Sequence, residues 1–391
     1  MKIVDVCAFY APRGGGVRTY VEHKLRLGAR LGHDIVIVAP GEHDGTEERK
    51  GGGRIIYVAS PALPLDRRYR YFADVGQVHA VLDSERPDIV EASSPWRTAS
   101  IVAGWWGNAP RALIMHADPM AAYPYRWFGG IAGRPTIDRQ FQWFWNHLRR
   151  AASRCDLVVS ANDSLSRRLR RGGLPAVRTI TMGTDQGIFS PSLRDEALRR
   201  DLLARCALDE DAMLLLAVGR HAPEKRWPMV INACLRAGIS RKLGLILIGE
   251  GRDRERLIRH VGASPHIQFL APIMDRQLLA RVMASADALI HGCEAETFGL
   301  VAAEAAASGL PLIVPAEGGS ADLATPATSE TYRPGDMHDA ARGILRMADR
   351  DRSETRRAAV DRAASVGTMD QHFERLFATY EGLKKQKRIA A

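Results

Sequence analysis

The sequence has no uninterrupted apolar run that approaches the roughly 20 residues needed to cross a bilayer. It also has no low-complexity tract, and its contents of 46% hydrophobic and 26% charged residues are typical of a globular protein with sizeable cores. The first residues lead directly into an apolar stretch and lack the parts of a secretory signal peptide. We therefore expect a cytoplasmic protein, with peripheral contact to the inner face of the cell membrane as a further option.

Cysteine is scarce, odd in number and scattered along the chain. No two cysteines have the spacing of a metal-binding pair, and no group of His, Cys and Asp has the spacing of a zinc or calcium site. The sequence therefore favours free thiols in a reducing compartment, and it predicts no metal or other cofactor. The cysteines are Cys7, Cys155, Cys206, Cys234 and Cys293.

The net charge of +10 is unevenly distributed. Residues 1–190 contain 26 Lys and Arg against 18 Asp and Glu, a net charge of +8, which leaves +2 for the remainder. A basic amino-terminal half indicates an anionic partner, which can be a phosphate group, an acidic membrane surface or nucleic acid. Because no nucleic-acid-binding motif accompanies the charge, we expect no nucleic acid partner.

Short β-branched runs alternate with helical patterns along the whole chain. Most of these runs are apolar throughout, which is typical of strands in a parallel sheet that is covered on both faces. One helical pattern, at 17–31, has a clear period of about 3.6 residues. The expected strands are 3–8, 34–39, 54–59, 88–92, 111–116, 156–160, 179–182, 213–218, 243–248, 266–270, 286–290 and 311–314.

Two successive series of strand–helix–strand units predict an α/β protein with two doubly wound, Rossmann-like domains. A stretch rich in Gly, Asp, Ser and Pro at 183–191 is the expected linker. We place the first domain at 1–190 and the second at 191–368. An amphipathic helix at 369–391 can pack on either domain, including back on the first. Such sheets bind ligands at the carboxyl ends of their strands, so functional residues are sought there.

The strongest functional pattern runs from Glu296 to Glu304, after the expected strand 286–290. A helix that began near Phe298 would offer its first free backbone N–H groups to an anion, and the flanking carboxylates can accept hydrogen bonds from sugar hydroxyls. From the residue types alone, an ordinary helix start with acidic residues at its positive end fits equally well. The N–H groups in question belong to Phe298, Gly299, Leu300 and Val301.

Arg220 and Lys225 follow the strand 213–218 and Gly219. An Arg and a Lys at this spacing can converge on a diphosphate, although solvated loop charges are the plain alternative. The glycines at 14–16 follow the first strand and permit close approach of a phosphate, and Arg18 lies in the next helical turn.

Two weaker candidates lie at further strand ends. His116 ends the strand 111–116, where a structural histidine is the alternative. Gly249 and Gly251 end the strand 243–248, where a simple strand-to-helix turn fits as well.

A stretch at 139–150 interleaves aromatic and basic residues. It predicts either a surface patch that docks on anionic lipid or a core-facing aromatic stripe with solvated arginines, and the sequence leaves both open. The candidate membrane-contacting residues are Phe141, Trp143, Trp145, Arg149 and Arg150.

The segment from Glu296 to Glu304 resembles the paired-glutamate element of the retaining glycosyltransferases of family 4, and the resemblance continues through 305–315 and the glycines at 318–319. The resemblance implies the GT-B architecture, in which two Rossmann-like domains face an interdomain cleft. The first domain would bind the acceptor and the second the nucleotide-sugar donor. Glu296 would contact the donor hexose, Glu304 the ribose, and the amides of 298–301 the sugar and diphosphate.

The same resemblance implies roles for the other strand-end residues. Arg220 and Lys225 match the family's pair on the leaving diphosphate, and His116 matches a histidine near the primary hydroxyl of the transferred sugar. Arg18 would lie near the acceptor. The implied catalytic residues are His116, Arg220, Lys225 and Glu296, and the implied donor-binding residues are Gly15, Gly16, Gly219, Gly249, Gly251, Phe298, Gly299, Leu300, Val301 and Glu304.

Together with His291 before the acidic segment, the resemblance favours a mannosyltransferase that uses GDP-mannose, with a UDP-hexose such as UDP-glucose as the alternative donor. It implies transfer with retention, without a metal, to a lipid, lipid-linked or saccharide acceptor at the cytoplasmic membrane face, as in glycolipid or polysaccharide biosynthesis. The alternatives are a sugar-nucleotide epimerase or phosphorylase on the same fold, and a non-catalytic basic membrane-surface protein.

Overall fold

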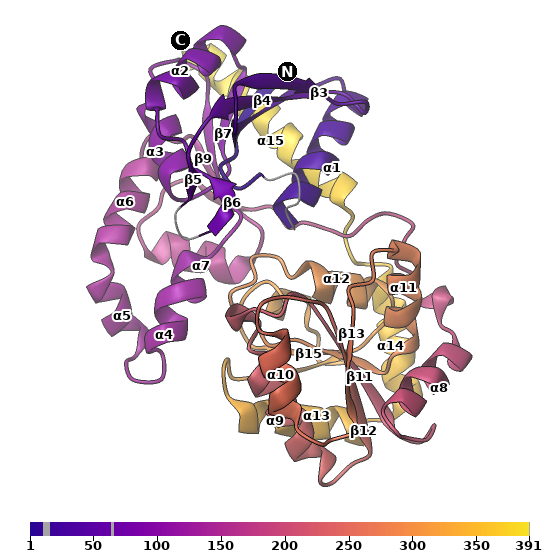
Figure 1. Ribbon diagram of the computed structural model, residues 1–391. Coiled ribbons are helices and arrows are strands. Elements are labelled where there is room, and N and C mark those ends of the chain that lie inside the picture. The colour runs from indigo at the N-terminus through magenta and orange to yellow at the C-terminus, as the bar shows by residue number, and fades with distance from the viewer. Residues whose placement is uncertain (11–15, 64–65, 391) are drawn as a thin grey trace. The chain divides into compact units, whose positions relative to one another are not determined.

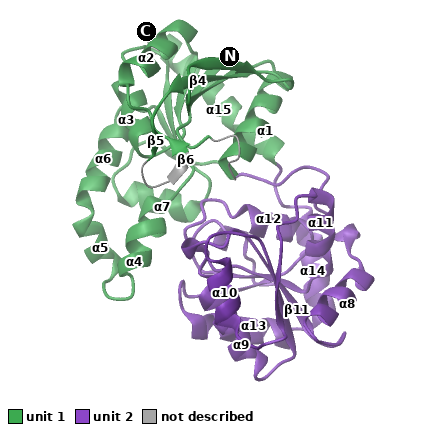
Figure 2. Ribbon diagram, viewed as in Figure 1, with its two compact units in different colours: residues 1–181, 369–391 green, residues 182–368 purple. Residues whose placement is uncertain are grey.

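The computed structural model describes residues 1–10, 16–63 and 66–390. The chain forms two compact units, Met1–Thr181 together with Met369–Ala391, and Met182–Thr368 (Figures 1 and 2). The boundary lies at residue 181, whereas the sequence places it at 190. The reason is that the segment after residue 181 joins the second unit, where the Thr184 N–H donates to the Gly367 carbonyl at 2.9 Å.

The first unit is built on an eight-stranded sheet in the order β10-β9-β8-β7-β1-β2-β4-β3. The pairs along this order are parallel except β3 with β4, and β5 pairs with β6 in a separate antiparallel hairpin. Its strands are β1 (Lys2–Val6), β2 (Asp34–Gly41), β3 (Gly45–Glu48), β4 (Arg54–Ala59), β5 (Ala62–Leu63), β6 (Asp66–Arg70), β7 (Ile89–Ala92), β8 (Arg111–Met115), β9 (Leu157–Ser160) and β10 (Val177–Thr179).

The central strands of this sheet are fully buried, as strands covered on both faces must be. The covering helices are α1 (Gly16–Arg30), α2 (Val75–Glu85), α3 (Arg97–Gly104), the π-helical turn η1 (Ala121–Tyr125), α4 (Arg126–Phe128), α5 (Arg134–Gln140), α6 (Gln142–Ala152), α7 (Asp163–Arg171) and α15 (Met369–Ala390).

The second unit is built on a six-stranded parallel sheet in the order β13-β12-β11-β14-β15-β16. Its strands are β11 (Met213–Val218), β12 (Leu243–Ile248), β13 (Ile267–Leu270), β14 (Ala288–Ile290), β15 (Leu312–Pro315) and β16 (Ser329–Tyr332). Its helices and short helical turns are η2 (Pro191–Leu193), α8 (Glu196–Arg205), η3 (Pro223–Lys225), α9 (Trp227–Gly238), α10 (Arg254–Val261), α11 (Arg276–Ser285), α12 (Leu300–Ala307), η4 (Ala321–Leu323), α13 (Met337–Asp349) and α14 (Arg352–Ala363).

Two hydrophobic cores lie on the two faces of this second sheet. One joins the strands to α9, α10 and α13, and the other joins them to α8, α11 and α12. Two doubly wound parallel sheets are therefore present, which confirms the predicted fold class.

Eleven of the twelve strands predicted from the sequence correspond to β1, β2, β4, β7 to β9 and β11 to β15, whereas the strand predicted at 179–182 shares only Thr179 with β10. The sequence does not predict β3, β5, β6 or β16. These strands are two to five residues long, and β3 reads GTEE and is exposed throughout. A short polar edge strand has no apolar pattern by which it can be recognised.

The carboxy-terminal helix α15 packs on the first unit. Phe373, Phe377 and Tyr380 on one side of the helix are fully buried, and the Phe373 ring lies 4.8 Å from that of Tyr20 in α1. Among the described residues, no helix has both the length and the apolar character needed to cross a membrane.

A buried ion cluster lies inside the first unit. The Lys24 ammonium in α1 donates to Asp5 at 2.8 Å and also to Glu91, and all three side chains are fully buried. Burial and the neighbouring Asp5 raise the pKa of Glu91 to about 7, although Lys24 opposes this rise. A single ammonium therefore compensates two buried carboxyl groups.

Replacing Lys24 with Met is expected to lower the free energy of unfolding by about 3–5 kcal/mol, because it leaves two carboxyl groups buried without their cation. Urea unfolding at pH 7 measures the change, and Arg26→Met, at an exposed site on the same helix, is the control. If Lys24→Met were as stable as the control, the ion cluster would not support the fold.

Candidate functional site

The carboxyl edge of the second sheet gathers charged residues from several loops. Because the strands are parallel, the loops after β11, β12, β13 and β14 all leave the sheet at this one edge. Three of the predicted residues, and one that the sequence does not predict, lie in these loops or at the start of the helices that follow them. We call this group, Lys225, Arg276, Glu296 and Glu304, the carboxyl-edge cluster.

Lys225 and Glu296 meet in an ion pair, although they are 71 residues apart. The 3₁₀ turn η3 brings Lys225 back toward the sheet, and its ammonium donates to Oε1 of Glu296. Both side chains are largely buried. The structure therefore joins two residues that the sequence connects only through a family resemblance.

Lys225 and Glu296 each favour the charged form of the other. Burial by itself raises the pKa of Glu296, but the Lys225 ammonium and the His291 ring outweigh burial and hold this pKa well below its ordinary value. Burial lowers the pKa of Lys225, and Glu296 more than reverses the effect. Both side chains are therefore charged at neutral pH.

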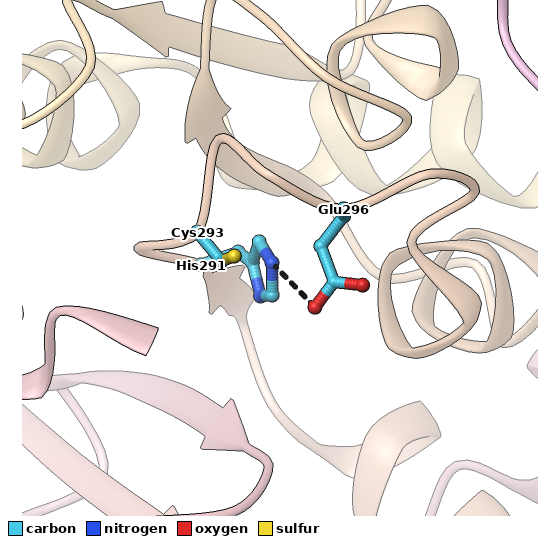
Figure 3. A group of neighbouring side chains, drawn as sticks. All are labelled: His291, Cys293 and Glu296. Atoms are coloured by element: carbon cyan, nitrogen blue, oxygen red, sulfur yellow. Dashed lines mark ion pairs between the residues drawn. The ribbon is translucent and has the colours of Figure 1, made fainter. Parts of the chain in front are cut away.

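His291 and Cys293 lie beside Glu296 on the loop after β14 (Figure 3). Nε2 of His291 lies 3.5 Å from Oε1 of Glu296. In the described part of the chain, these three residues form one group whose ligand atoms all lie within 4.8 Å, close enough to surround a cation. However, burial raises the pKa of the Cys293 thiol to about 12, so the thiol keeps its proton at neutral pH. The Lys225 ammonium already neutralises the Glu296 carboxylate. A thiol and an ammonium make this a poor donor set for a metal ion.

Glu294 is not part of the carboxyl-edge cluster, because its carboxylate binds Arg226 and holds the loop after β14 in place. Nε of Arg226 donates to both carboxylate oxygens of Glu294, at 3.0 and 2.8 Å, and the carboxylate is buried. The Tyr332 hydroxyl donates to the carbonyl of His291 on the same loop. These bonds fix the backbone that carries Glu296.

The helix α12 begins at Leu300, two residues after the start expected at Phe298. Gly299 caps it with φ of 79°, a left-handed conformation that glycine adopts without strain. A Cβ atom at Gly299 would lie 3.1 Å from the Ser320 amide nitrogen, so the loop after β15 passes close to this cap. The free N–H groups at the start of a helix attract anions, and here they begin at Leu300 and Val301.

Glu304 lies in the second turn of α12 and is held by a residue that the sequence analysis missed. Nη2 of Arg276 donates to Glu304 at 2.6 Å and to Asp185 at 2.8 Å, and its guanidinium lies 4.8 Å from the centre of the Phe189 ring. Burial raises the pKa of Glu304, and Arg276 limits the rise. The one available signal for Arg276 was a basic residue shortly after an expected strand end.

Arg220 does not share a partner with Lys225. Its side chain is exposed and donates to Glu224 at 3.0 Å, whereas Lys225 contacts Glu296. An exposed pair four residues apart in sequence is weak, so Arg220 is free to exchange Glu224 for another anion.

Gly249 and Gly251 form a tight turn against the loop after β11. At Gly249 a Cβ atom would lie 2.0 Å from the carbonyl oxygen of Gly219, so the two loops pack without room for side chains. His221 is fully buried beneath this turn, and its backbone N–H donates to the Glu250 carbonyl at 2.7 Å. No pattern in the sequence singles out His221.

The predicted residues of the first unit lie at the start of α1 and after β8. Gly15 lies outside the described residues, whereas Gly16 and Arg18 are exposed in the first turn of α1. His116 is half-buried, and its ring centre lies 4.6 Å from that of Tyr20. Burial lowers the pKa of His116 to about 4, so its ring is neutral at pH 7.

The aromatic stretch at 139–150 divides into a buried and an exposed part. The helical pattern breaks at Phe141, between α5 and α6. Trp145 is buried and donates to Asp138 at 3.2 Å, so the expectation that it contacts a membrane is wrong. Trp143 and Arg150 are exposed, Phe141 is half-buried, and Arg149 is tied to the Gly172 carbonyl at 2.8 Å.

The two Rossmann-like units have the GT-B architecture, and the family matches and curated relatives that follow identify the chain as a nucleotide-sugar glycosyltransferase. The chain belongs to glycosyltransferase family 4. Residues 14–186 match the family described as Glycosyltransferase Family 4, and residues 199–366 match Glycosyl transferases group 1. The sequence-based prediction of the family is confirmed.

Two curated relatives come from Mycobacterium tuberculosis. A GDP-mannose-dependent alpha-mannosyltransferase is 31% identical over 83% of this chain and 82% of the relative. A GDP-mannose-dependent alpha-(1-6)-phosphatidylinositol dimannoside mannosyltransferase is 29% identical over 94% of this chain and 97% of the relative.

Solved structures show the same fold. Sucrose-phosphate synthase from Thermosynechococcus elongatus superposes with a TM-score of 0.76 at 20% identity, covering 98% of this chain and 99% of that one. HepE of Anabaena in complex with UDP has a TM-score of 0.71 at 17% identity, covering 98% of this chain and 100% of that one.

Proposed function

We propose that the protein transfers mannose from GDP-mannose to a lipid or lipid-linked saccharide acceptor, with retention of the anomeric configuration. The observation that carries this proposal is the ion pair between Lys225 and Glu296, next to the start of α12. The names of the two mycobacterial relatives, both GDP-mannose-dependent, support the choice of donor.

The proposed chemistry follows from where charge develops. When the bond between the anomeric carbon and the diphosphate breaks, negative charge grows on the leaving phosphate oxygens. Lys225 and the free N–H groups at Leu300 and Val301 are fixed positive groups that stabilise this charge, and Arg220 can join them by leaving Glu224. Glu296 keeps the Lys225 side chain in place and offers a carboxylate to the sugar hydroxyls.

Retention requires that the acceptor approach from the face that the leaving group vacates. We propose that the departing phosphate takes the acceptor proton, so that no protein base is needed. Glu304 would bind the ribose hydroxyls. The positive charge that a metal supplies elsewhere would come from Lys225, and we propose that the reaction needs neither a metal nor another cofactor.

A transfer assay tests this function. Purified protein is incubated with EDTA and either GDP-mannose or UDP-glucose, together with a polyprenyl-phosphate or phosphatidylinositol-type acceptor. We expect transfer from GDP-mannose and an α-linked product by NMR. A β-linked product would overturn retention, and activity that EDTA abolishes would overturn metal independence. Epimerisation or phosphorolysis of the donor without transfer would instead support the alternative enzyme classes.

We further propose that an exposed aromatic surface of the first unit contacts the membrane. Five rings follow one another with centres 5.5 to 6.4 Å apart. Residues 119–155 carry six arginines and a single acidic residue, Asp138, which accepts hydrogen bonds from Tyr125 and Trp145. An aromatic surface flanked by arginines suits an anionic bilayer. The five rings, which we call the aromatic surface, are Tyr123, Trp127, Phe128, Phe141 and Trp143.

Replacing Trp127 and Trp143 together with Ser is expected to weaken binding to vesicles by about tenfold or more, because it removes at least about 1.4 kcal/mol of apolar burial. Co-sedimentation with vesicles that contain anionic phosphatidylglycerol measures the effect. Trp106→Ser is the control, since Trp106 is 91% exposed after α3. Unchanged binding by the double variant would remove this surface from the proposal.

A further inference from the structure

A cavity lies at the edge of the second sheet opposite the carboxyl-edge cluster. It has a volume of about 310 Å³ and lies where β11, β14 and β15 begin, against the end of α13 and the first turns of α14. This volume is at the lower end of the range for small-molecule sites, about 300–1,000 Å³. We call it the amino-edge pocket.

Four arginines and a single acid, Asp287, are the charged residues of its lining. Asp287 is already engaged, because the Arg199 guanidinium donates to both of its oxygens, at 3.0 and 2.7 Å. Two of the four lining arginines have carboxylate partners elsewhere. Arg194 donates to Glu196, and Arg350 donates to Glu330.

The other two, Arg352 and Arg356, have hydrogen bonds to main-chain carbonyls. Nη2 of Arg352 donates to Asp211 at 3.3 Å, and Nη2 of Arg356 donates to Ala284 at 3.0 Å. Nη1 of Arg356 is buried and has no acceptor among the described residues. A buried donor without a partner is unfavourable, so the pocket lacks a negative group at this point.

The charges around Arg356 also indicate that the pocket suits an anion. Burial and the nearby positive charge of Arg194 lower the pKa of Arg356 to about 10, and Asp287 and Glu196 do not cancel the effect. The acid at the start of α14, Asp351, is used as the helix cap and accepts from the Glu354 N–H at 2.8 Å.

We propose that the amino-edge pocket binds a small phosphate monoester with an apolar part, separately from the donor. Arg352 and Arg356 are four residues apart and share one face of α14, so two cations meet a group that carries about −1.5 to −2 charges at pH 7. The opposite walls are apolar and suit the uncharged part of the ligand. They are formed by Met213, Pro311, Met347 and Ala348.

Titration calorimetry with phenyl phosphate tests the proposal, with and without saturating GDP, and with phenol as the uncharged control. We expect saturable binding that GDP does not displace and that phenol lacks. In Arg356→Met the affinity should fall about tenfold or more, because a charge-assisted bond is lost. The matched control is Arg357→Met, an exposed neighbour on the same helix, which should bind as the wild type does.

Thermal unfolding distinguishes a binding role from a structural one. Arg356→Met should melt at the wild-type temperature or above it, because it removes an unpartnered buried donor, and Arg194 still donates to the Ala284 carbonyl at 3.3 Å. A lower melting temperature would mean that Arg356 supports the fold instead.

Three outcomes of the titration would overturn the proposal. They are the absence of saturable binding, equal binding by Arg356→Met, and displacement by GDP, which would place phenyl phosphate at the carboxyl edge. None of them depends on transfer activity, so the pocket and the proposed function fail separately.

Discussion

Replacing Lys225 with Ala is expected to lower turnover about 10²–10³-fold, the usual loss when one fixed donor to a developing negative charge is removed. The expected change in melting temperature is only a few degrees. Lys225 and Glu296 keep 13% and 23% of their side chains exposed, so water can solvate Glu296 once the ammonium is gone.

The control for this prediction is Lys242→Ala. Lys242 is also paired with an acid, Asp211 at 2.8 Å, but it lies just before β12, away from the cluster. Initial rates with saturating GDP-mannose and calorimetric melting curves compare the two variants. Near-wild-type turnover of Lys225→Ala, with an unchanged melting curve, would remove Lys225 from the catalytic machinery.

Replacing Glu304 with Ala should weaken binding of the donor about 10- to 100-fold and lower turnover at saturation much less. The reason is that the hydrogen bonds from the ribose hydroxyls to the carboxylate, which together contribute about 1.5–3 kcal/mol, form equally before and during the reaction. Glu304 is buried and already oriented by Arg276, so little reorganisation precedes binding.

Asp185→Asn separates this role from a structural one, because Asp185 is the other acid that Arg276 contacts. Fluorescence or calorimetric titration with GDP gives both dissociation constants. If Asp185→Asn weakened binding as much as Glu304→Ala, the effect would come from a displaced Arg276, and the ribose contact would be refuted.

The sequence was most informative where the signal was local. Apolar runs predicted most strands of both sheets, and the spacing of Glu296 and Glu304 predicted a helix start between them. The start itself was misplaced by two residues, because Gly299 turns into the left-handed region and delays the first helical turn. That turn depends on the close packing of the Ser320 loop, which no local pattern records.

Contacts between distant segments could not be predicted in the same way. The bond of Arg276 to Glu304 joins α11 to α12, and its second bond to Asp185 spans 91 residues. Trp143 and Trp145 have the same chemistry, yet only Trp145 faces the core, because residues two apart on helix α6 point to opposite sides. The lining of the amino-edge pocket likewise comes from separate segments of the chain, the first at Arg194 and the last at Arg356, which no local pattern connects.

The most direct test of the donor site is a thermal-shift titration of the wild type and Glu304→Ala with GDP, UDP and ADP and their hexose conjugates. A ligand that binds only the native state raises the melting temperature as its concentration exceeds its dissociation constant. We predict that GDP and GDP-mannose stabilise the wild type most and that Glu304→Ala loses most of this shift. Stabilisation by none of these ligands, or an equal shift in the variant, would contradict the assignment of the carboxyl-edge cluster as the donor site.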